Sequence, residues 1–364
     1  MIATACAAIL GMSTLGNAED LHLGQTVGFT GPQAGNVKEL TDGAKLWIDA
    51  VNAKGGINGQ KIILDSIDDG YDPKVAGENA KKLINSGVLA LFLSRGTQLV
   101  EPLADQVSVA VVAPSSGAMI MHNPVKRVVF NVRSKFQAEA ERAIKHLSIV
   151  GLTRIGVVYV DDTFGKDGLA GADRGLQEAN INPTWKLAYD RTTPKFAPII
   201  ETIIKSNVQA VLVIATGAQA SDLIAGARAA GSVTQFITLS NNSSKSFVKS
   251  LGENARGVMV TQVFPNPRRS SHAFLVEFQK LARDAGVELS YTAVEGFVSA
   301  KVMVEGLRRA ASKGPVTRPK LIEALNSIRN YDVGGLQLSY SPTDHTGFDY
   351  VEISIINAKG EFLE

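Results

Sequence analysis

The 364-residue chain contains a single cysteine, Cys6, and this residue lies among the first eighteen. The remainder of the chain therefore has neither a pair of cysteines for a disulfide nor a thiol that could act as a nucleophile. This absence excludes a disulfide-stabilised scaffold and excludes thiol-based catalysis in residues 19–364.

The motifs of nucleotide and metal sites are also missing. A dinucleotide site needs three glycines at fixed spacing after a strand, and Gly28-Phe29-Thr30-Gly31-Pro32 lacks that spacing. There is no P-loop lysine pattern. The five histidines show no i, i+4 pair, and the Asp161-Asp162 pair is interpreted as a turn or helix cap rather than a Mg²⁺ site. We therefore expect no cofactor and no metal.

The clearest candidate for a nucleophile is Ser115-Ser116-Gly117, after a strand that ends at Ala113-Pro114. This segment lacks the Gly-x-Ser-x-Gly elbow, and no motif places a histidine to activate a serine. We predict that the protein is not an enzyme.

Composition indicates a soluble globular protein, with 45% hydrophobic and 20% charged residues. The formal net charge of +2 gives no reason to expect a nucleic-acid or membrane-surface partner. The length predicts two domains, each large enough for its own core.

Residues 1–18 differ from the rest because they carry no charge and end in Gly16-Asn17-Ala18. An apolar run that ends in small residues is typical of a signal peptide, and this run is too short to span a bilayer. No Lys or Arg precedes the run, so its first part is expected to be incomplete. A disordered tail and a lipoprotein with Cys6 as its modified residue are the alternatives. We predict export to the periplasm.

The segment Asn52–Pro73 (NAKGGINGQKIILDSIDDGYDP) indicates the fold class. Gly55-Gly56 suits the end of a helix, and Ile62–Leu64 has the apolar run of a buried strand. Asp72 followed by Pro73 is typical of a helix start. Its acidic turn is interpreted as loop and cap structure. Such β-α-β-α order predicts a parallel sheet covered by helices.

Strand and helix signals alternate in two series of similar size, the second of which begins at Arg154. We therefore predict an α/β protein of two doubly wound lobes. The C-terminal third has helical patterns near 273–285, 291–311 and 318–327, followed by a predicted hairpin of 336–340 with 350–356. The predicted division is residues 20–133 with 266–330 for one lobe, and residues 134–265 with 331–364 for the other.

Small polar turns recur at the carboxyl ends of the predicted strands. They are Gly31–Gly35, Ser94–Thr97, Pro114–Gly117, Thr163–Gly165, Thr216–Ala218 and Asn241–Ser243. Each alone is ordinary loop chemistry. Together they leave N–H groups exposed at helix N-termini of both lobes, and such groups hold carboxylates well. A cleft between the lobes would collect them.

The chain resembles the type I periplasmic solute-binding proteins of the branched-chain amino acid family. The resemblance rests on the Asn52–Pro73 segment, on VGFTGPQAG at the first strand, on APSSG and VYVDDTFGKDG, and on ARAAGSVTQFI at 227–237. It implies two Rossmann-like lobes joined by three crossings, with a ligand held between them. It also implies a partner, an ABC-type permease at the inner membrane, to which a monomer delivers its solute.

The resemblance places the ligand's carboxylate at Ser94–Thr97 and Ser115–Gly117, with Phe164 covering the ligand. Arg95 stands where the family usually has a serine. The predicted ligand-binding residues are Ser94, Arg95, Gly96, Thr97, Ser115, Ser116, Gly117, Phe164, Thr216, Gly217 and Asn241.

The sequence does not determine whether the other end of the ligand carries an ammonium group. Amino acid binders of this family usually place an acidic residue after the strand that matches 235–239, and this chain has Ser240-Asn241-Asn242 there. A buried ammonium without a counter-charge is costly. The ligand is therefore either a branched-chain or related amino acid, or a carboxylate without an ammonium, such as an aromatic or keto acid. A free ligand sensor of the same fold is the alternative to a transport role.

Overall fold

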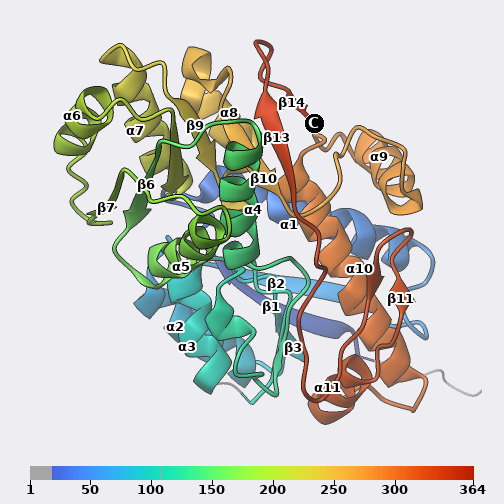
Figure 1. The fold of residues 1–364 in the computed structure, drawn as a ribbon. Helices are drawn as coiled ribbons and strands as arrows, with labels where there is room; N and C mark the ends of the chain where they lie inside the picture. The colour runs from blue at the N-terminus through green and yellow to red at the C-terminus, as the bar shows by residue number, and fades with distance from the viewer. Residues whose placement is uncertain (1–18, 107) are drawn as a thin grey trace, which may run out of the picture.

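The computed structural model describes residues 19–106 and 108–364, and Figure 1 shows two lobes, each built on its own sheet. The predicted signal peptide and Cys6 lie outside these residues. No helix in the described part of the chain is long and apolar enough to cross a membrane.

The first lobe contains a five-stranded parallel sheet in the order β2-β1-β3-β4-β5. Its strands are β1 (Leu21–Val27), β2 (Ile62–Asp68), β3 (Ala90–Phe92), β4 (Ala110–Val112) and β5 (Val129–Phe130). The helices that follow these strands are α1 (Ala34–Ala53), α2 (Pro73–Asn85) and α3 (Thr97–Gln106), with a 3₁₀ turn at Met119–Met121.

The second lobe contains a seven-stranded sheet in the order β14-β13-β10-β9-β8-β6-β7, in which β13 runs antiparallel to β10 and β14. Its strands are β6 (Ile155–Val160), β7 (Trp185–Tyr189), β8 (Ala210–Ile214), β9 (Gln235–Thr238), β10 (Met259–Gln262), β13 (Glu352–Ile356) and β14 (Phe362–Leu363). Its helices are α4 (Phe136–Ile149), α5 (Thr163–Glu178), α6 (Ala197–Lys205), α7 (Gly217–Ala229) and α8 (Lys245–Leu251), with 3₁₀ turns at Ser240–Asn242 and Gly252–Ala255. The prediction of two doubly wound lobes is confirmed.

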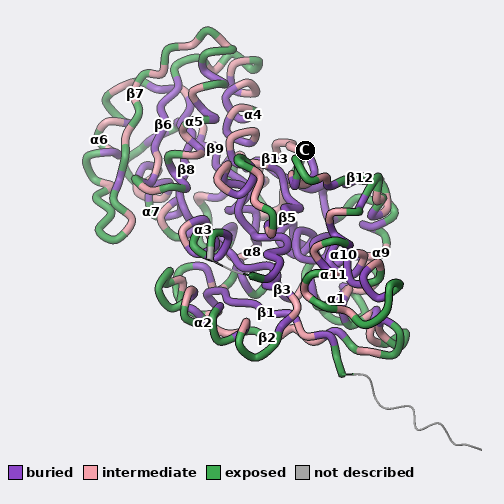
Figure 2. The backbone as a smooth tube through the Cα atoms, turned by 90° about the horizontal axis from the view of Figure 1, so that it is seen from below, coloured by how far each residue is buried: buried purple, intermediate pink, exposed green. Residues whose placement is uncertain are grey.

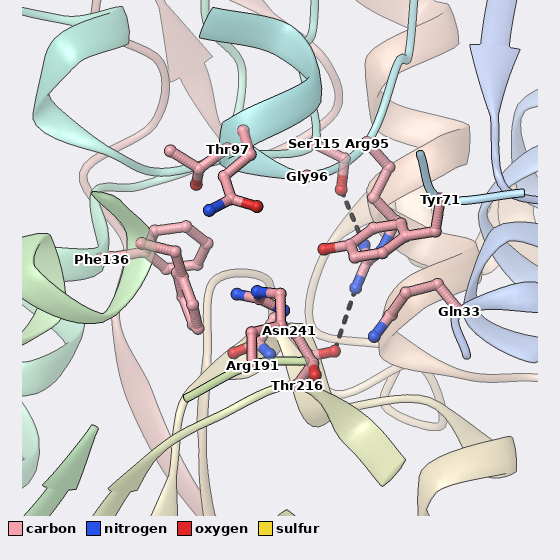
Figure 3. A pocket seen from close by; sticks show the side chains of 12 residues that line it. Gln33, Tyr71, Arg95, Gly96, Thr97, Ser115, Phe136, Arg191, Thr216 and Asn241 are labelled. Atoms are coloured by element: carbon pink, nitrogen blue, oxygen red, sulfur yellow. Dashed lines mark hydrogen bonds between the residues drawn. The ribbon is translucent and has the colours of Figure 1, made fainter. Parts of the chain in front are cut away.

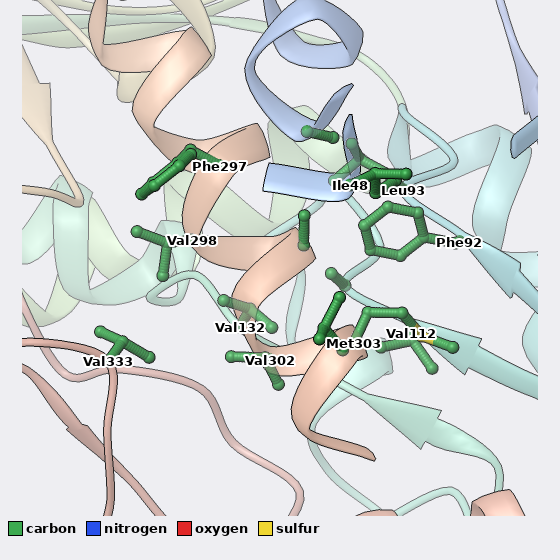
Figure 4. Close-up of a cluster of buried hydrophobic side chains, with 14 of the residues drawn as sticks. Ile48, Phe92, Leu93, Val112, Val132, Phe297, Val298, Val302, Met303 and Val333 are labelled. Carbon is green, nitrogen blue, oxygen red and sulfur yellow. The ribbon is translucent and has the colours of Figure 1, made fainter. Parts of the chain in front are cut away.

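Three C-terminal helices, α9 (Ala273–Ala285), α10 (Tyr291–Ala311) and α11 (Arg318–Asn326), return to the first lobe. Figure 4 shows Phe297, Val298 and Val302 of α10 in the same apolar cluster as Phe92 and Val112. The predicted positions of these helices are therefore confirmed to within a residue.

The predicted C-terminal hairpin is wrong. β12 (Gln337–Leu338) pairs with β11 (Tyr331–Asp332), and β13 pairs with β10 and β14. Leu338, Tyr340 and Phe348 lie in the core of the first lobe. The division of the chain into two lobes stays a prediction. Because these three residues pack in the first lobe, the chain is expected to pass to the second lobe for the last time near residue 349.

The Asn52–Pro73 segment has the predicted local structure. Gly55 and Gly56 have φ of +95° and +69° after α1, a region that glycine enters without a steric cost. The Asp72 side chain accepts hydrogen bonds from the N–H groups of Lys74 (2.7 Å) and Val75 (3.2 Å) at the start of α2.

The chain crosses between the lobes three times, after β5, after β10 and before β13, and Figure 2 shows the buried backbone continuing through this region. The lobes also touch directly. The Glu39 carboxylate of α1 accepts hydrogen bonds from the main-chain N–H groups of Lys245 (3.1 Å) and Ser246 (3.0 Å) at the start of α8. Burial raises the pKa of Glu39.

Candidate functional site

Two turns at the ends of β3 and β4 form the wall of the site on the first lobe. Leu93 and Ala113, which precede these turns, have φ of +61° and +51°. Non-glycine residues with such φ values are strained, and strain of this kind concentrates at functional sites. The turns are joined by a hydrogen bond from the Ser115 N–H to the Ser94 carbonyl, at 2.8 Å. The strained backbone thus presents Arg95 and Ser115 side by side.

Arg95 is a buried cation, with 5% of its surface exposed. Its Nη1 donates to Ser115 Oγ at 2.8 Å, and its Nη2 donates across the cleft to the main-chain carbonyl of Asn241 at 3.0 Å. No carboxylate of the described residues lies within 4.0 Å of its nitrogens. Burial lowers the pKa of Arg95. Buried charges in proteins are usually paired directly with an opposite charge, whereas Glu295 is linked to Arg95 only through the Ser115 hydroxyl.

A cavity lies beside Arg95, lined by residues from both lobes. Figure 3 shows side chains from both lobes pointing into it. Its lining consists of Gln33, Tyr71, Arg95, Gly96, Thr97, Gln98, Ser115, Phe136, Phe164, Arg191, Thr216 and Asn241. No Asp or Glu is among these lining residues, so its charged lining side chains are two arginines.

Seven of the predicted ligand-binding residues line this cavity: Arg95, Gly96, Thr97, Ser115, Phe164, Thr216 and Asn241. The other four lie elsewhere. Ser94 and Ser116 are buried behind the turns, where Ser116 Oγ is 2.8 Å from Thr97 Oγ1. A side chain at Gly117 would meet the Ser134 carbonyl at 2.6 Å, which indicates a packing role. Gly217 lines a separate hollow together with Gly31 and Pro32.

Five lining residues were not predicted: Gln33, Tyr71, Gln98, Phe136 and Arg191. Gln33 lies in a predicted polar turn and Gln98 lies directly after one. These turns are the sequence feature from which both residues could have been predicted to line the cavity. Phe136, Arg191 and Tyr71 follow no pattern that sequence spacing could detect.

Tyr71 comes from the acidic turn of the Asn52–Pro73 segment and has a φ of +66°. Asp69 holds this backbone, because its Oδ1 accepts the Tyr71 N–H at 2.9 Å and its Oδ2 accepts the Thr26 hydroxyl at 3.0 Å. Burial raises the pKa of Tyr71. The acidic turn is therefore loop structure, as predicted, and it also supplies one wall of the cavity.

The second arginine of the lining, Arg191, is paired. Its Nε donates to Asp162 Oδ2 at 2.6 Å, and its Nη2 forms an ion pair with the same oxygen at 2.5 Å. The other oxygen of Asp162 accepts the Gly165 N–H at 3.0 Å and so caps α5. The Asp162 carboxylate therefore already caps α5 and pairs with Arg191. For this reason it is a poor counter-charge for a ligand's ammonium. No group of three or more potential metal-ligating side chains occurs in residues 19–106 and 108–364.

A second buried ionic network lies behind the cavity at the first crossing. Arg133, with 1% of its surface exposed, pairs with Glu139 and donates to Ser240 Oγ at 2.7 Å. Its guanidinium carbon also lies 4.5 Å from the centre of the ring of Phe136, which lines the cavity. Glu295 connects the two networks, because it accepts the Ser115 hydroxyl at 2.7 Å and lies 3.9 Å from Arg133.

Residues 20–361 match the family model described as "Periplasmic binding protein". The chain belongs to this family. Its members named below are binding proteins, and this chain is likewise a binding protein and not an enzyme.

Curated relatives in the family include the Leu/Ile/Val-binding protein of Escherichia coli K12, 27% identical over 258 residues, which are 70% of each chain. The leucine-specific-binding protein of Salmonella typhimurium LT2 is 24% identical over 315 residues, 84% of each chain. Among solved structures, a substrate-binding periplasmic protein from Ralstonia solanacearum is 32% identical with a TM-score of 0.86. That match covers 94% of this chain and 99% of the other.

Proposed function

We propose that this protein is the periplasmic solute-binding component of an ABC importer and that it captures a small carboxylated solute between its lobes. The observation that carries the ligand class is Arg95, a buried guanidinium that faces the cavity and has no carboxylate partner among the described residues. A ligand carboxylate would supply that partner through charge-assisted hydrogen bonds, which are the strong ones in proteins. The curated relatives, which are named for binding Leu, Ile and Val, support an amino acid or a compound of similar size.

The proposed mechanism is closure of the two lobes about the three crossings. Arg95 and Ser115 come from the first lobe, whereas Thr216, Asn241 and Arg191 come from the second. A ligand that contacts both sets favours the closed arrangement over the open one, and it shifts the equilibrium by its difference in affinity for the two.

A carboxylate without an ammonium is the second candidate, and the Asp162–Arg191 pair favours it. The acid that could have balanced a ligand's ammonium is already bound to a cation and a helix N-terminus. An ammonium in the cavity would face two arginines and no free carboxylate.

The test is binding of leucine, 4-methyl-2-oxopentanoate and their methyl esters, measured by calorimetry and by thermal shift. We expect the carboxylates to bind and the esters to bind at least tenfold more weakly. Arg95→Ala should weaken carboxylate binding at least tenfold, about 1.4 kcal/mol. The control is Arg154→Ala, which removes an exposed arginine far from the cavity. Equal binding of acid and ester, or unchanged affinity in Arg95→Ala, would refute the carboxylate site.

A further inference from the structure

Two buried polar atoms in the cavity wall lack partners. Gln33 is 2% exposed and Asn241 is 9% exposed. Gln33 Nε2 and Asn241 Oδ1 have no hydrogen-bond partner among the described residues. Both residues line the cavity, and in Figure 3 the nitrogen end of Gln33 points into it. One atom is a donor and the other is an acceptor, and leaving either unpaired in the interior is costly.

The neighbouring hydrogen bonds determine which end of each amide is free. Asn241 Nδ2 faces two acceptors, the Ala215 carbonyl at 3.0 Å and Asn242 Oδ1 at 3.1 Å, so Oδ1 is the free end. Asn36 Nδ2 lies 2.7 Å from Gln33 Oε1 and 3.5 Å from the main-chain carbonyl of Asn241, so Nε2 is the free end of Gln33.

The same contacts place the residues Gln33 and Asn241 beside Arg95. Asn36 bridges Gln33 and Asn241, and the Arg95 guanidinium donates to the same Asn241 carbonyl at 3.0 Å. Because Gln33, Arg95 and Asn241 all line the cavity, a carboxylate bound at Arg95 is expected to present its α-substituent to the part of the lining that contains Gln33 and Asn241.

We propose that Gln33 and Asn241 form an α-substituent subsite that selects 2-hydroxy carboxylates over 2-amino and 2-oxo carboxylates. This proposal rests on the proposed carboxylate site. A hydroxyl group accepts from Gln33 Nε2 and donates to Asn241 Oδ1, and so satisfies both atoms. An ammonium only donates, which leaves Gln33 Nε2 unpaired beside another donor. A ketone only accepts, which leaves Asn241 Oδ1 facing another acceptor. Sites with buried polar groups reject strongly the analogues that leave those groups unpaired. The remaining wall contains Phe136 and Phe164, which suits an apolar side chain on the ligand.

The test uses two matched trios that differ only at the α-carbon. The first is 2-hydroxy-4-methylpentanoate, leucine and 4-methyl-2-oxopentanoate, and the second is phenyllactate, phenylalanine and phenylpyruvate. Calorimetry on the full chain should show the hydroxy acid of at least one trio binding tenfold or more tightly than both of its analogues.

The two variants should fail in different ways. Gln33→Met removes the donor, so the preference for hydroxy over amino acid should fall at least tenfold while the preference over the oxo acid stays. Asn241→Leu removes the acceptor, so the preference over the oxo acid should fall while that over the amino acid stays. Gln177→Met changes an exposed glutamine of α5 outside the cavity lining in the same way and should leave both ratios unchanged.

The outcomes separate this subsite from the proposed function. Tenfold tighter binding of an amino or oxo acid by the unaltered protein, or ratios that Gln33→Met and Asn241→Leu do not move, would overturn the subsite and leave carboxylate capture standing. Binding of no member of either trio at millimolar concentration would overturn both proposals.

Discussion

The two buried arginines, Arg133 and Arg95, differ in what neutralises them. Arg133 pairs with Glu139, lies near Glu295 and packs on the Phe136 ring. Arg95 has hydroxyl and carbonyl partners only, and it faces the cavity. A charge paired with carboxylates belongs to the scaffold at the crossing, whereas a buried charge without a carboxylate within 4.0 Å is the one we propose to hold the ligand. On this proposal, burial alone does not identify a binding residue, and the missing carboxylate partner does.

Removing the paired arginine should have the largest effect on stability. Arg133→Met leaves Glu139 buried without its cation, and the loss of one member of a buried pair costs about 3–5 kcal/mol. Urea unfolding should show this fall in the free energy of unfolding. Arg95→Met removes a cation that has no acid partner and should cost clearly less. An equal loss in both variants would remove the distinction between the two arginines.

The comparison extends to buried histidines, where the missing partner makes stability depend on pH. His122 is 5% exposed, both ring nitrogens lack partners among the described residues, and burial lowers its pKa to about 3. Lys135 and Arg133 lower this pKa further, and Asp344 raises it slightly.

Because the folded pKa of His122 lies below the ordinary 6.5, the unfolded chain binds a proton that the folded chain does not. The stability from neutral His122 is present above pH 6.5 and is lost as the pH falls toward 3. At pH 4.5 the loss is on the order of 2 kcal/mol. We expect His122→Leu to lose less stability between pH 7 and pH 4.5 than the unaltered protein, as measured by urea unfolding. His272→Leu serves as the control, and a parallel loss in all three proteins would contradict the assignment to His122.

The smallest effect is expected from Arg95→Lys. Lysine keeps the charge but has no planar fork, so it cannot serve Ser115, Asn241 and a ligand carboxylate together. Calorimetry should show three- to tenfold weaker carboxylate binding, about 1 kcal/mol, with the urea midpoint unchanged. Full affinity in Arg95→Lys would mean that charge alone, without the geometry of the guanidinium, holds the ligand.

Local sequence patterns predict the frame of this protein well. Asp72-Pro73 and Gly55-Gly56 mark helix ends because capping and left-handed backbone depend on adjacent residues only. The C-terminal hairpin was mispredicted because strand pairing is a non-local choice. Tyr331–Asp332 is close enough to pair with Gln337–Leu338, and Glu352–Ile356 finds a partner in β10, about ninety residues earlier.

The cavity was predicted only in part, for a similar reason. Turns after strands identify Arg95, Ser115 and Asn241, because carboxyl ends of parallel strands meet at one edge. Tyr71 reaches the cavity through a strained turn, and Arg191 is positioned by an ion pair. Neither feature produces a repeating pattern in the sequence. The state of each buried group also depends on contacts that spacing cannot show, as with Asp162, whose partner is 29 positions away.

The Glu39 contact with α8 has a practical consequence for using this protein as a reagent. It joins the lobes outside the cavity lining, so under the proposed closure we expect a change at position 39 to alter the fraction of closed molecules without touching any ligand contact proposed above. Apparent affinity scales with the fraction of molecules in the binding-competent state. A fluorescent biosensor built on this chain would therefore have two separate adjustments: residue 39 for the working concentration range, and Gln33, Arg95 and Asn241 for the choice of analyte.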